Sequence, residues 1–250
     1  MDQSAIEQAG RLLAASRRTG TRIEGLPASC RPATVDDVHA IQLATAAALG
    51  ETIAGWKVSA PIEDRVVRGA ILQSVVFASP ARVAAAGMKM LGVEAEIAFL
   101  FDRDLPPRAA EYSHDEVAAA ATAFPAIEIV DTRFADYAAA SLLDRSADCV
   151  SNGGFVRGPL QPGWRGHDLR GIEVVLTVGG TEVVRRRGGH AAGDPLLPAV
   201  ALVNDLRLGS GVRAGQFMTT GTYTGLNFAK PGQPVVARFA GMGSAELRFT

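Results

Sequence analysis

The sequence contains little cysteine and almost no excess charge. Its two cysteines, Cys30 and Cys149, have neither the spacing of a metal site nor the number needed for a disulfide framework, which fits a reducing compartment. There are 25 Lys and Arg against 26 Asp and Glu, for a net charge of −1. Proteins that bind nucleic acids or membrane surfaces usually carry a basic excess. The composition therefore argues against both roles.

Several common motifs are also missing. The chain has no G-x-x-x-x-G-K-S/T phosphate loop, no G-x-G-x-x-G between a strand and a helix, and no G-x-S-x-G elbow. The four histidines, at positions 39, 114, 167 and 190, show no mutual ligand spacing. No apolar run is long enough to span a bilayer, and the polar N-terminus lacks the apolar core of a signal peptide. We expect a soluble, cytoplasmic protein.

What the sequence does contain predicts an α+β protein. Apolar residues make up 48% of the 250 residues, enough for a substantial core. Helical spacing and end signals predict two helices, at residues 4–18 and 34–50. From residue 52 on, short β-type runs dominate, with isolated helices between them. We expect one domain over residues 1–250, with a helical segment at 1–50 and a β-rich core at 51–250.

Three stretches of the core carry more specific expectations. Residues 52–60, TIAGWKVSA, read as a strand with Lys57 among apolar neighbours. Such a lysine either loses pKa through burial and transfers protons, or extends its ammonium group to the surface. The charged residues 63–69 predict a loop or a brief helix. The alanine-rich residues 131–148 predict an irregular helix, and a further helix is expected to begin at Asp194.

Carboxylates stand out in two of the predicted strands. In Gly92–Phe101, GVEAEIAFLF, Glu94 and Glu96 would share one face of a strand, because alternate side chains point the same way. In the next predicted strand, Glu128 stands alone among apolar residues, a costly position unless its charge is compensated. One divalent cation would compensate all three. A solvated edge strand is the alternative interpretation of Glu94 and Glu96 alone.

Five segments, in this order, resemble one known family. They are G-W-K-V-S at 55–59, V-E-A-E-I-A at 93–98, P-A-I-E-I-V at 125–130, A-D-x-x-S-N-G-G at 147–154 and T-T-G-T-Y-T-G at 219–225. The chain is similar, from about residue 50 to its C-terminus, to the 2-keto-4-pentenoate hydratases and the related oxalocrotonate decarboxylases of the fumarylacetoacetate hydrolase superfamily. The resemblance implies a mixed β-sandwich or β-roll with peripheral helices.

The resemblance also implies a site, a cofactor and an assembly. It implies a homo-oligomer that binds a small 2-oxo acid together with Mg²⁺ or Mn²⁺. The matching positions are Glu94, Glu96 and Glu128 for the metal, Lys57 and Asp148 for catalysis, and Ser151, Gly221 and Thr222 for the substrate. For Asp148 a structural role remains an alternative.

The reaction that the resemblance implies is the addition of water to a 2-hydroxy-2,4-dienoate to give a 4-hydroxy-2-oxo acid. Decarboxylation of an oxalocrotonate is the main alternative. Hydrolysis of an acylpyruvate is disfavoured because no H-x-x-E pair occurs in the chain, and a non-catalytic binding protein is disfavoured because the glutamates and the lysine are present. The segment Pro61–Ser79 departs from the hydratase pattern, which leaves the substrate tail open.

Overall fold

The N-terminal segment forms the two expected helices, and the computed structural model describes all of residues 1–250. Helix α1 (Gln3–Thr19) ends at Gly20, whose φ of 72° is the left-handed conformation that glycine accepts most readily. Helix α2 (Val35–Leu49) begins with a capping box in which the side chains of Thr34 and Asp37 each accept the other's backbone N–H. These caps explain why the sequence located both helices well.

The rest of the chain alternates strands with short helices. In chain order the elements are β1 (Ile53–Ile62), β2 (Arg65–Leu72), β3 (Val76–Ala78), β4 (Ala81–Val83), β5 (Gly92–Phe101), α3 (His114–Ala119), β6 (Ala121–Val130), α4 (Leu142–Ala147), β7 (Asn152–Arg157), β8 (Glu173–Val178), β9 (Thr181–Arg187), α5 (Leu196–Leu206), β10 (Phe217–Thr222), β11 (Asn227–Phe228), β12 (Pro234–Phe239) and β13 (Gly243–Phe249). None of the helices combines the length and apolar character needed to cross a membrane.

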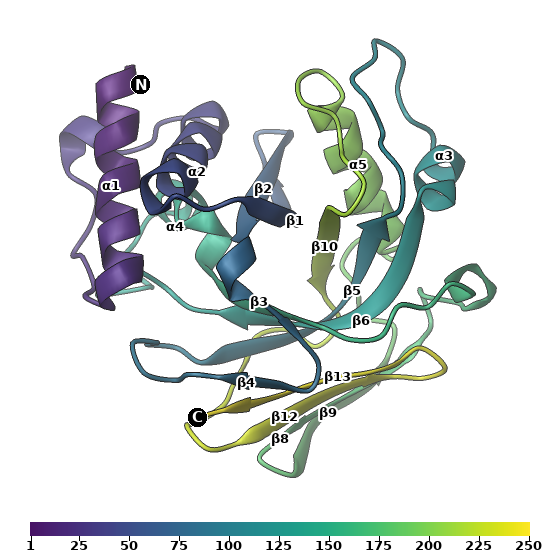
Figure 1. The fold of residues 1–250 in the computed structure, drawn as a ribbon. Coiled ribbons are helices and arrows are strands. Elements are labelled where there is room, and N and C mark those ends of the chain that lie inside the picture. The colour runs from purple at the N-terminus through teal and green to yellow at the C-terminus, as the bar shows by residue number, and fades with distance from the viewer.

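The strands form two sheets that pack face to face. The larger sheet has the order β2-β1-β10-β5-β6-β7-β3, with β11 added beside β5, and the smaller one has the order β4-β13-β12-β8-β9. Both contain parallel and antiparallel neighbours. Figure 1 shows the small sheet below β5 and β6, and the helices α1, α2 and α5 on the other side of the large sheet. The expected mixed α+β sandwich with peripheral helices is confirmed.

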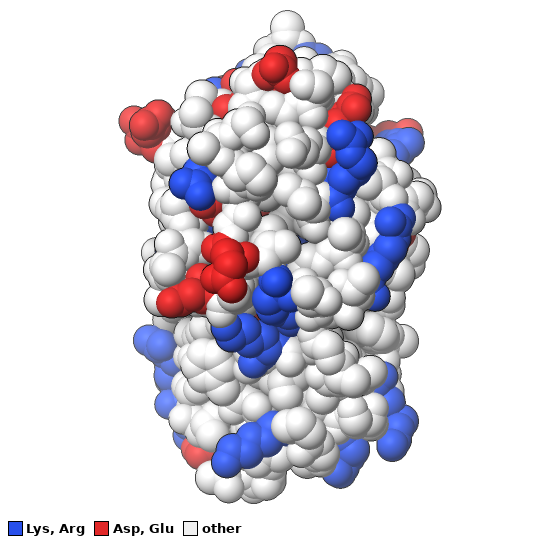
Figure 2. All heavy atoms as spheres, turned by 90° about the vertical axis from the view of Figure 1, so that its left-hand side faces the viewer, with Lys and Arg blue, Asp and Glu red and all other residues white.

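Strand β5 divides its side chains between the core and the helical side of the large sheet. Val93, Ala95, Ile97 and Phe99 are fully buried and belong to one apolar cluster with side chains of the small sheet. The intervening glutamates therefore point away from the small sheet. On the outer surface that carries α1, acidic and basic side chains lie interspersed without a dominant sign (Figure 2).

Two expectations about local structure are wrong. Residues 63–69 contain a tight turn, with Glu63 and Asp64 at positive φ, followed by strand β2 rather than a loop or helix. Antiparallel pairing with β1 along most of its length outweighs the charged composition of this segment.

Within residues 131–148 only α4 is helical. The first residues of that stretch instead hold ion pairs, from Asp131 to Arg22 and from Arg133 to Asp148. Helix α5 begins at Leu196, two residues later than expected, with its N–H donated to the Asp194 side chain.

Candidate metal and active site

Three glutamates meet on the helical side of the large sheet. Strands β5 and β6 are antiparallel with Glu94 directly opposite Glu128, and Glu96 follows two residues later on the same face. One carboxylate oxygen from each glutamate lies within 4.8 Å of the others. Glu96 and Glu128 are almost completely buried, and Glu94 is partly exposed. The strand register thus brings together the carboxylates that the sequence singled out.

Lys57 reaches this cluster from β1. Its Nζ lies 2.6 Å from Oε1 of Glu128 and also donates to the backbone carbonyl of Val150 at 3.2 Å. The lysine is buried, so it does not extend to the surface as one of the two sequence interpretations proposed. It is the group that brings positive charge directly to the carboxylates.

Two further side chains contact the glutamates, and one oxygen remains without a partner. The amide of Asn152 donates to Oε1 of Glu128 at 3.0 Å, and the hydroxyl of Thr219 donates to Glu96. The second oxygen of Glu128, Oε2, is buried and accepts no hydrogen bond. A buried charged oxygen without a partner is costly. The protein's own donors therefore leave this cluster incompletely satisfied.

The pKa values of the cluster also indicate that its charges are incompletely compensated. Burial raises the pKa of Glu94 to about 7, an effect that the charge of Lys57 only partly offsets. Burial, followed by the charges of Glu128 and Glu94, raises the pKa of Glu96 well above its usual range. For Lys57, burial lowers the pKa, but the three carboxylates outweigh burial and raise it to about 12. The lowered lysine pKa expected from the sequence does not hold while only Lys57 opposes the carboxylates.

These residues fit Mg²⁺ or Mn²⁺. Such cations prefer oxygen ligands, and a small number of carboxylates completed by water or substrate oxygens is their usual environment. Here three carboxylates converge beside one lysine, so their full ionisation would leave an excess of negative charge, and the unpartnered Oε2 of Glu128 offers a free ligand position. A divalent cation would balance the excess charge and satisfy that oxygen.

The stabilisation that a metal confers should increase with pH. Cations compete with protons for carboxylates, and the pKa of Glu94 is about 7. As pH rises from about 4.5 through 7, Glu94 loses its proton in the folded protein and the carboxylate charges come to repel one another. The metal-free protein therefore loses stability over this range, and the metal relieves more repulsion. We expect the increase in Tm caused by Mg²⁺ to grow between pH 5.5 and 8. His39 is neutral because burial lowers its pKa to about 3, and it makes the protein more stable as pH rises. This effect is the same with and without metal. The difference between the Tm values with and without Mg²⁺ therefore reports on the glutamates.

Glu94 and Glu96 line a cavity of about 600 Å³, together with Lys57, which is paired with Glu128. Lys57 and the residues after it on β1 form one wall, and Gly221 and Thr222 at the end of β10 form another. The third wall comes from residues 190–192 and from Leu197, Pro198 and Ala201 at the start of α5. Lys57 is the only lysine or arginine that lines the cavity. The rest of the wall is neutral apart from the glutamates at the base.

Sequence reasoning missed His190, which lines the same cavity. Its Nε2 donates to the carbonyl of Thr220 at 2.9 Å, while its Nδ1 accepts the N–H of Ala192 at 3.2 Å. These partners define a neutral ring, and burial lowers its pKa. Both nitrogens are engaged, so His190 shapes the wall next to Gly221 rather than offering a free base. His190 has no regular spacing to the glutamates in the sequence. It lies in the cavity wall because it donates a hydrogen bond to the carbonyl of Thr220 on β10.

Two residues that the resemblance placed in the site lie beside the cavity rather than in its wall. Asp148 is buried and forms ion pairs with Arg133 at 2.7 Å and with Arg17 at 3.1 Å. Ser151 is buried, has a φ of 58°, and its carbonyl accepts the N–H of Asp131. Between them, Val150 does line the cavity. The geometry supports the structural alternative for Asp148.

Comparison with known proteins identifies close counterparts over the whole chain. The sequence is 30% identical to a 2-keto-4-pentenoate hydratase of Paraburkholderia xenovorans (strain LB400), over 97% of this chain and 94% of that protein. A 4-oxalocrotonate decarboxylase of Pseudomonas putida is also 30% identical, over 63% of this chain and 59% of that protein. No family model matches the chain.

Solved structures agree about the fold. The 4-oxalocrotonate decarboxylase of Pseudomonas putida G7, complexed with magnesium and adipate, superposes with a TM-score of 0.87 at 22% identity, covering 100% of this chain and 99% of that one. A 2-hydroxyhepta-2,4-diene-1,7-dioate isomerase from Mycobacterium marinum superposes with a TM-score of 0.56 at 15% identity, over 80% of this chain and 76% of that one. Given the full-length sequence match to hydratases, the chain belongs to the 2-keto-4-pentenoate hydratase family.

Proposed function

We propose that the protein is a metal-dependent hydro-lyase that adds water to a 2-hydroxy-2,4-dienoate, in its 2-oxo-4-enoate form, to give a 4-hydroxy-2-oxo acid. The observation that supports this most strongly is the cluster of three converging glutamates and Lys57, of which Glu94, Glu96 and Lys57 line an otherwise neutral cavity. A divalent cation held by Glu94, Glu96 and Glu128 would polarise the ketone of the 2-oxo acid and stabilise the negative charge that develops when a proton leaves C3.

The chain's own residues take the remaining roles. Lys57 is the proton-transfer group, because its Nζ lies in the cavity and is held between Glu128 and the carbonyl of Val150. Gly221 and Thr222 would bind the substrate carboxylate through the backbone and hydroxyl that they present to the cavity. Ser151 remains a predicted substrate contact.

The cavity wall favours a substrate with an uncharged tail. An oxalocrotonate carries a second carboxylate, and burying that charge without a cationic partner is costly. Beyond the metal-binding glutamates and Lys57, the wall offers Ala60, Pro61, Leu197 and Pro198 but no arginine or further lysine. A neutral vinyl tail suits such a wall. Hydration therefore fits this cavity better than decarboxylation, which remains the second candidate.

A substrate panel tests this proposal. Purified protein with Mg²⁺ would be offered 2-hydroxypenta-2,4-dienoate, an oxalocrotonate and an acylpyruvate, and the products followed by NMR. We expect a 4-hydroxy-2-oxo acid from the first compound and little turnover of the others. Release of CO₂ from the oxalocrotonate, without hydration of the dienoate, would establish the decarboxylase instead.

We also propose that the chain acts in the cytoplasm as a homo-oligomer. The two cysteines are free and buried, as in a reducing compartment. Large apolar side chains remain exposed on the single chain, among them Leu43 at 51%, Leu208 at 74% and Phe228 at 59%. Such side chains are candidates for burial between subunits. Light scattering at micromolar concentration is expected to give a multiple of 26.1 kDa, and a monomer would contradict the assembly.

The helical segment 1–50 and the core 51–250 are proposed to form one domain. Arg17 of α1 forms an ion pair with Asp148 and donates to the carbonyl of Asn152, whose side chain contacts Glu128. A helix that contributes to the surroundings of the site in this way is expected to unfold together with the core. A single thermal transition by both circular dichroism and tryptophan fluorescence is the expected observation.

A further inference from the structure

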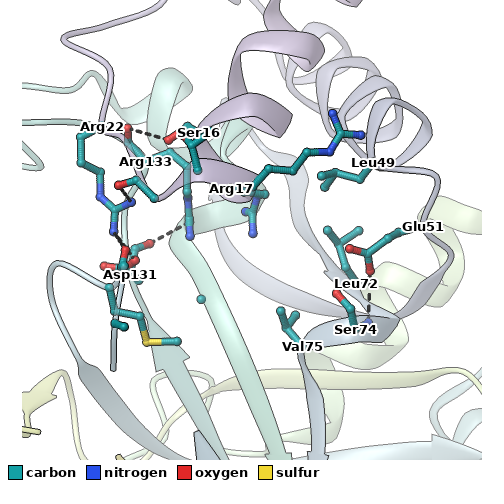
Figure 3. Close-up of a pocket in the computed structure, with 17 residues that line it drawn as sticks. Ser16, Arg17, Arg22, Leu49, Glu51, Leu72, Ser74, Val75, Asp131 and Arg133 are labelled. Carbon is teal, nitrogen blue, oxygen red and sulfur yellow. Dashed lines mark hydrogen bonds and ion pairs between the residues drawn. The ribbon is translucent and has the colours of Figure 1, made fainter. Parts of the chain in front are cut away.

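A second cavity, of about 560 Å³, lies between the helical segment and the large sheet. It shares no lining residue with the cavity above the glutamates. Its walls come from the C-terminal end of α1, the end of α2, the end of β2 with the residues that follow it, and the loop at residues 86–88. Figure 3 shows Arg17, Arg22 and Arg133 on one side of this cavity and Leu72 and Val75 on the other.

Four arginines line this cavity, and not all of their charge is balanced. Three of them have carboxylate partners: Arg22 lies 2.7 Å from Asp131, and Arg133 and Arg17 share Asp148. Asp131 also accepts the backbone N–H groups of residues 89 and 90.

The fourth arginine, Arg18, has no carboxylate partner and contacts only the carbonyl of Ala48. The remaining lining carboxylate, Glu51, accepts the N–H of Ser74 rather than an arginine. Four positive groups thus face three carboxylates, and the Nε groups of Arg17 and Arg22 are buried without any acceptor. The accessible guanidinium of Arg18 is suited to a carboxylate or phosphate, whose paired oxygens match the guanidinium fork.

The apolar residues of this cavity indicate the chemical class of ligand that fits it. Leu72 and Val75 line the cavity across from Arg17, Arg22 and Arg133. Leu49 follows Ala48, which Arg18 contacts, and Met88 follows Gly87, which Arg22 contacts, so apolar side chains also lie beside the arginines. Inorganic phosphate would leave these side chains without a contact. A short organic carboxylate would place its oxygens at the arginines and its carbon chain against the apolar wall.

The arginines of this cavity are connected to the glutamate site. Asp148, which Arg17 and Arg133 hold, precedes Cys149, Val150 and Ser151, which have φ values of 53°, 53° and 58°. Three successive non-glycine residues in the left-handed region persist only where surrounding contacts hold them. Some of these contacts come from the two arginines, which hold Asp148 and the carbonyl of Asn152 on either side of the three residues.

The same short loop delivers two contacts to the active site. The carbonyl of Val150 accepts a hydrogen bond from Lys57, and the side chain of Asn152 donates to Glu128. The carbonyl of Asn152 accepts from both Arg17 and Arg133. Any change in how these arginines are held therefore reaches Lys57 and Glu128 through one segment.

We propose that the arginine-lined cavity is a regulatory site for a small organic carboxylate with a short carbon chain. The ligand carboxylate would pair with Arg18, which has no carboxylate partner, and its charge would lie near Arg17 and Arg22 without breaking the ion pairs of Asp148. It would thereby restrain the 149–151 loop and alter turnover at Lys57. The binding part of this proposal is independent of the reaction proposed above, whereas the effect on turnover needs an active enzyme.

Succinate is the probe, titrated by calorimetry into chelator-treated protein so that the metal site does not capture it. Two variants change the cavity and leave the pairs of Asp148 intact. Arg18→Gln removes the unbalanced charge, and Leu49→Glu places a carboxylate near Arg18, where it would compete with the ligand. Arg238→Gln, an exposed arginine of β12 without ion pairs, gives the same change of net charge and is the control. Inorganic phosphate is titrated in parallel.

We expect saturable binding of succinate, weakened at least about fivefold by Arg18→Gln and more strongly by Leu49→Glu, with no change in Arg238→Gln. Phosphate should bind more weakly than succinate.

Binding that is the same in all four proteins, or no saturable binding, would overturn the site, and tighter binding of phosphate would overturn the ligand class. With Mg²⁺ and the dienoate, succinate should change kcat in the parent and Arg238→Gln proteins but not in Leu49→Glu. Unchanged kcat despite binding would overturn regulation, while absence of any dienoate turnover would count against the proposed reaction only.

Discussion

Replacing Lys57 with methionine is expected to lower kcat for the dienoate by on the order of 10²-fold or more, the usual effect of losing general acid–base help. Lys57 is the only lysine or arginine that lines the cavity, and its Nζ lies 2.6 Å from Glu128. Methionine has a similar length and fills the same buried space, so the change removes the proton-carrying group with little loss of packing. Steady-state kinetics with Mg²⁺ measure the effect.

Lys57→Met should also change the stability of the protein, in a way that distinguishes a loss of catalysis from a loss of folding. Without Lys57, no neighbouring cation offsets the three glutamates, so the metal-free protein should melt at a lower temperature. Mg²⁺ should restore most of that loss, because the cation replaces the missing positive charge. Lys230→Met changes an exposed lysine and should alter neither kcat nor Tm. Nearly full activity of the Lys57→Met protein would exclude Lys57 as the proton-transfer group.

Glu128→Gln is expected to abolish the stabilisation of the protein by Mg²⁺ or Mn²⁺. In the parent, metal at about 100 times its Kd should add about 2.7 kcal/mol to the free energy of unfolding. For a chain of this length, that gain corresponds to a rise in Tm of roughly 5–10 °C. Glutamine keeps the shape of the side chain and can still contact Asn152, but it removes the charge and weakens the free Oε2 position as a metal ligand.

The control for this measurement is Glu24→Gln, an exposed glutamate far from the cluster in sequence and outside the cavity lining. It should keep the full metal response. The melting temperatures of chelator-treated proteins, measured with increasing Mg²⁺, give the comparison. A response to metal in Glu128→Gln equal to that of the parent would remove Glu128 from the metal site.

Local sequence patterns determined the features that depend on neighbouring residues. Alternation in the β5 segment separated its apolar residues from Glu94 and Glu96, and an alternating strand can present them in only that way. Caps located α1 and α2 because the capping side chains lie within a few residues of the backbone groups that they satisfy. The ordered motifs identified the family for the same reason, since each is a short local segment.

Only the tertiary structure decided how Lys57 is used. From sequence, burial with a lowered pKa and escape to the surface were both open. The strand order β1-β10-β5-β6 places the lysine two strands from Glu94 and Glu96 and three from Glu128, and their charges raise its pKa to about 12. Strand order is a long-range property, and no residue near Lys57 in the sequence encodes it.

The positions of Asp148 and His190 likewise could not be predicted from the sequence. Asp148 sits in a segment whose motif placed it in the active site, yet arginines from α1 and from the residues after β6 hold it beside the cavity. His190 has no recognisable spacing to any site residue, yet it lines the cavity because β10 supplies the carbonyl that it binds. Their partners are distant in sequence, and such contacts form only when packing of the whole chain brings the elements together.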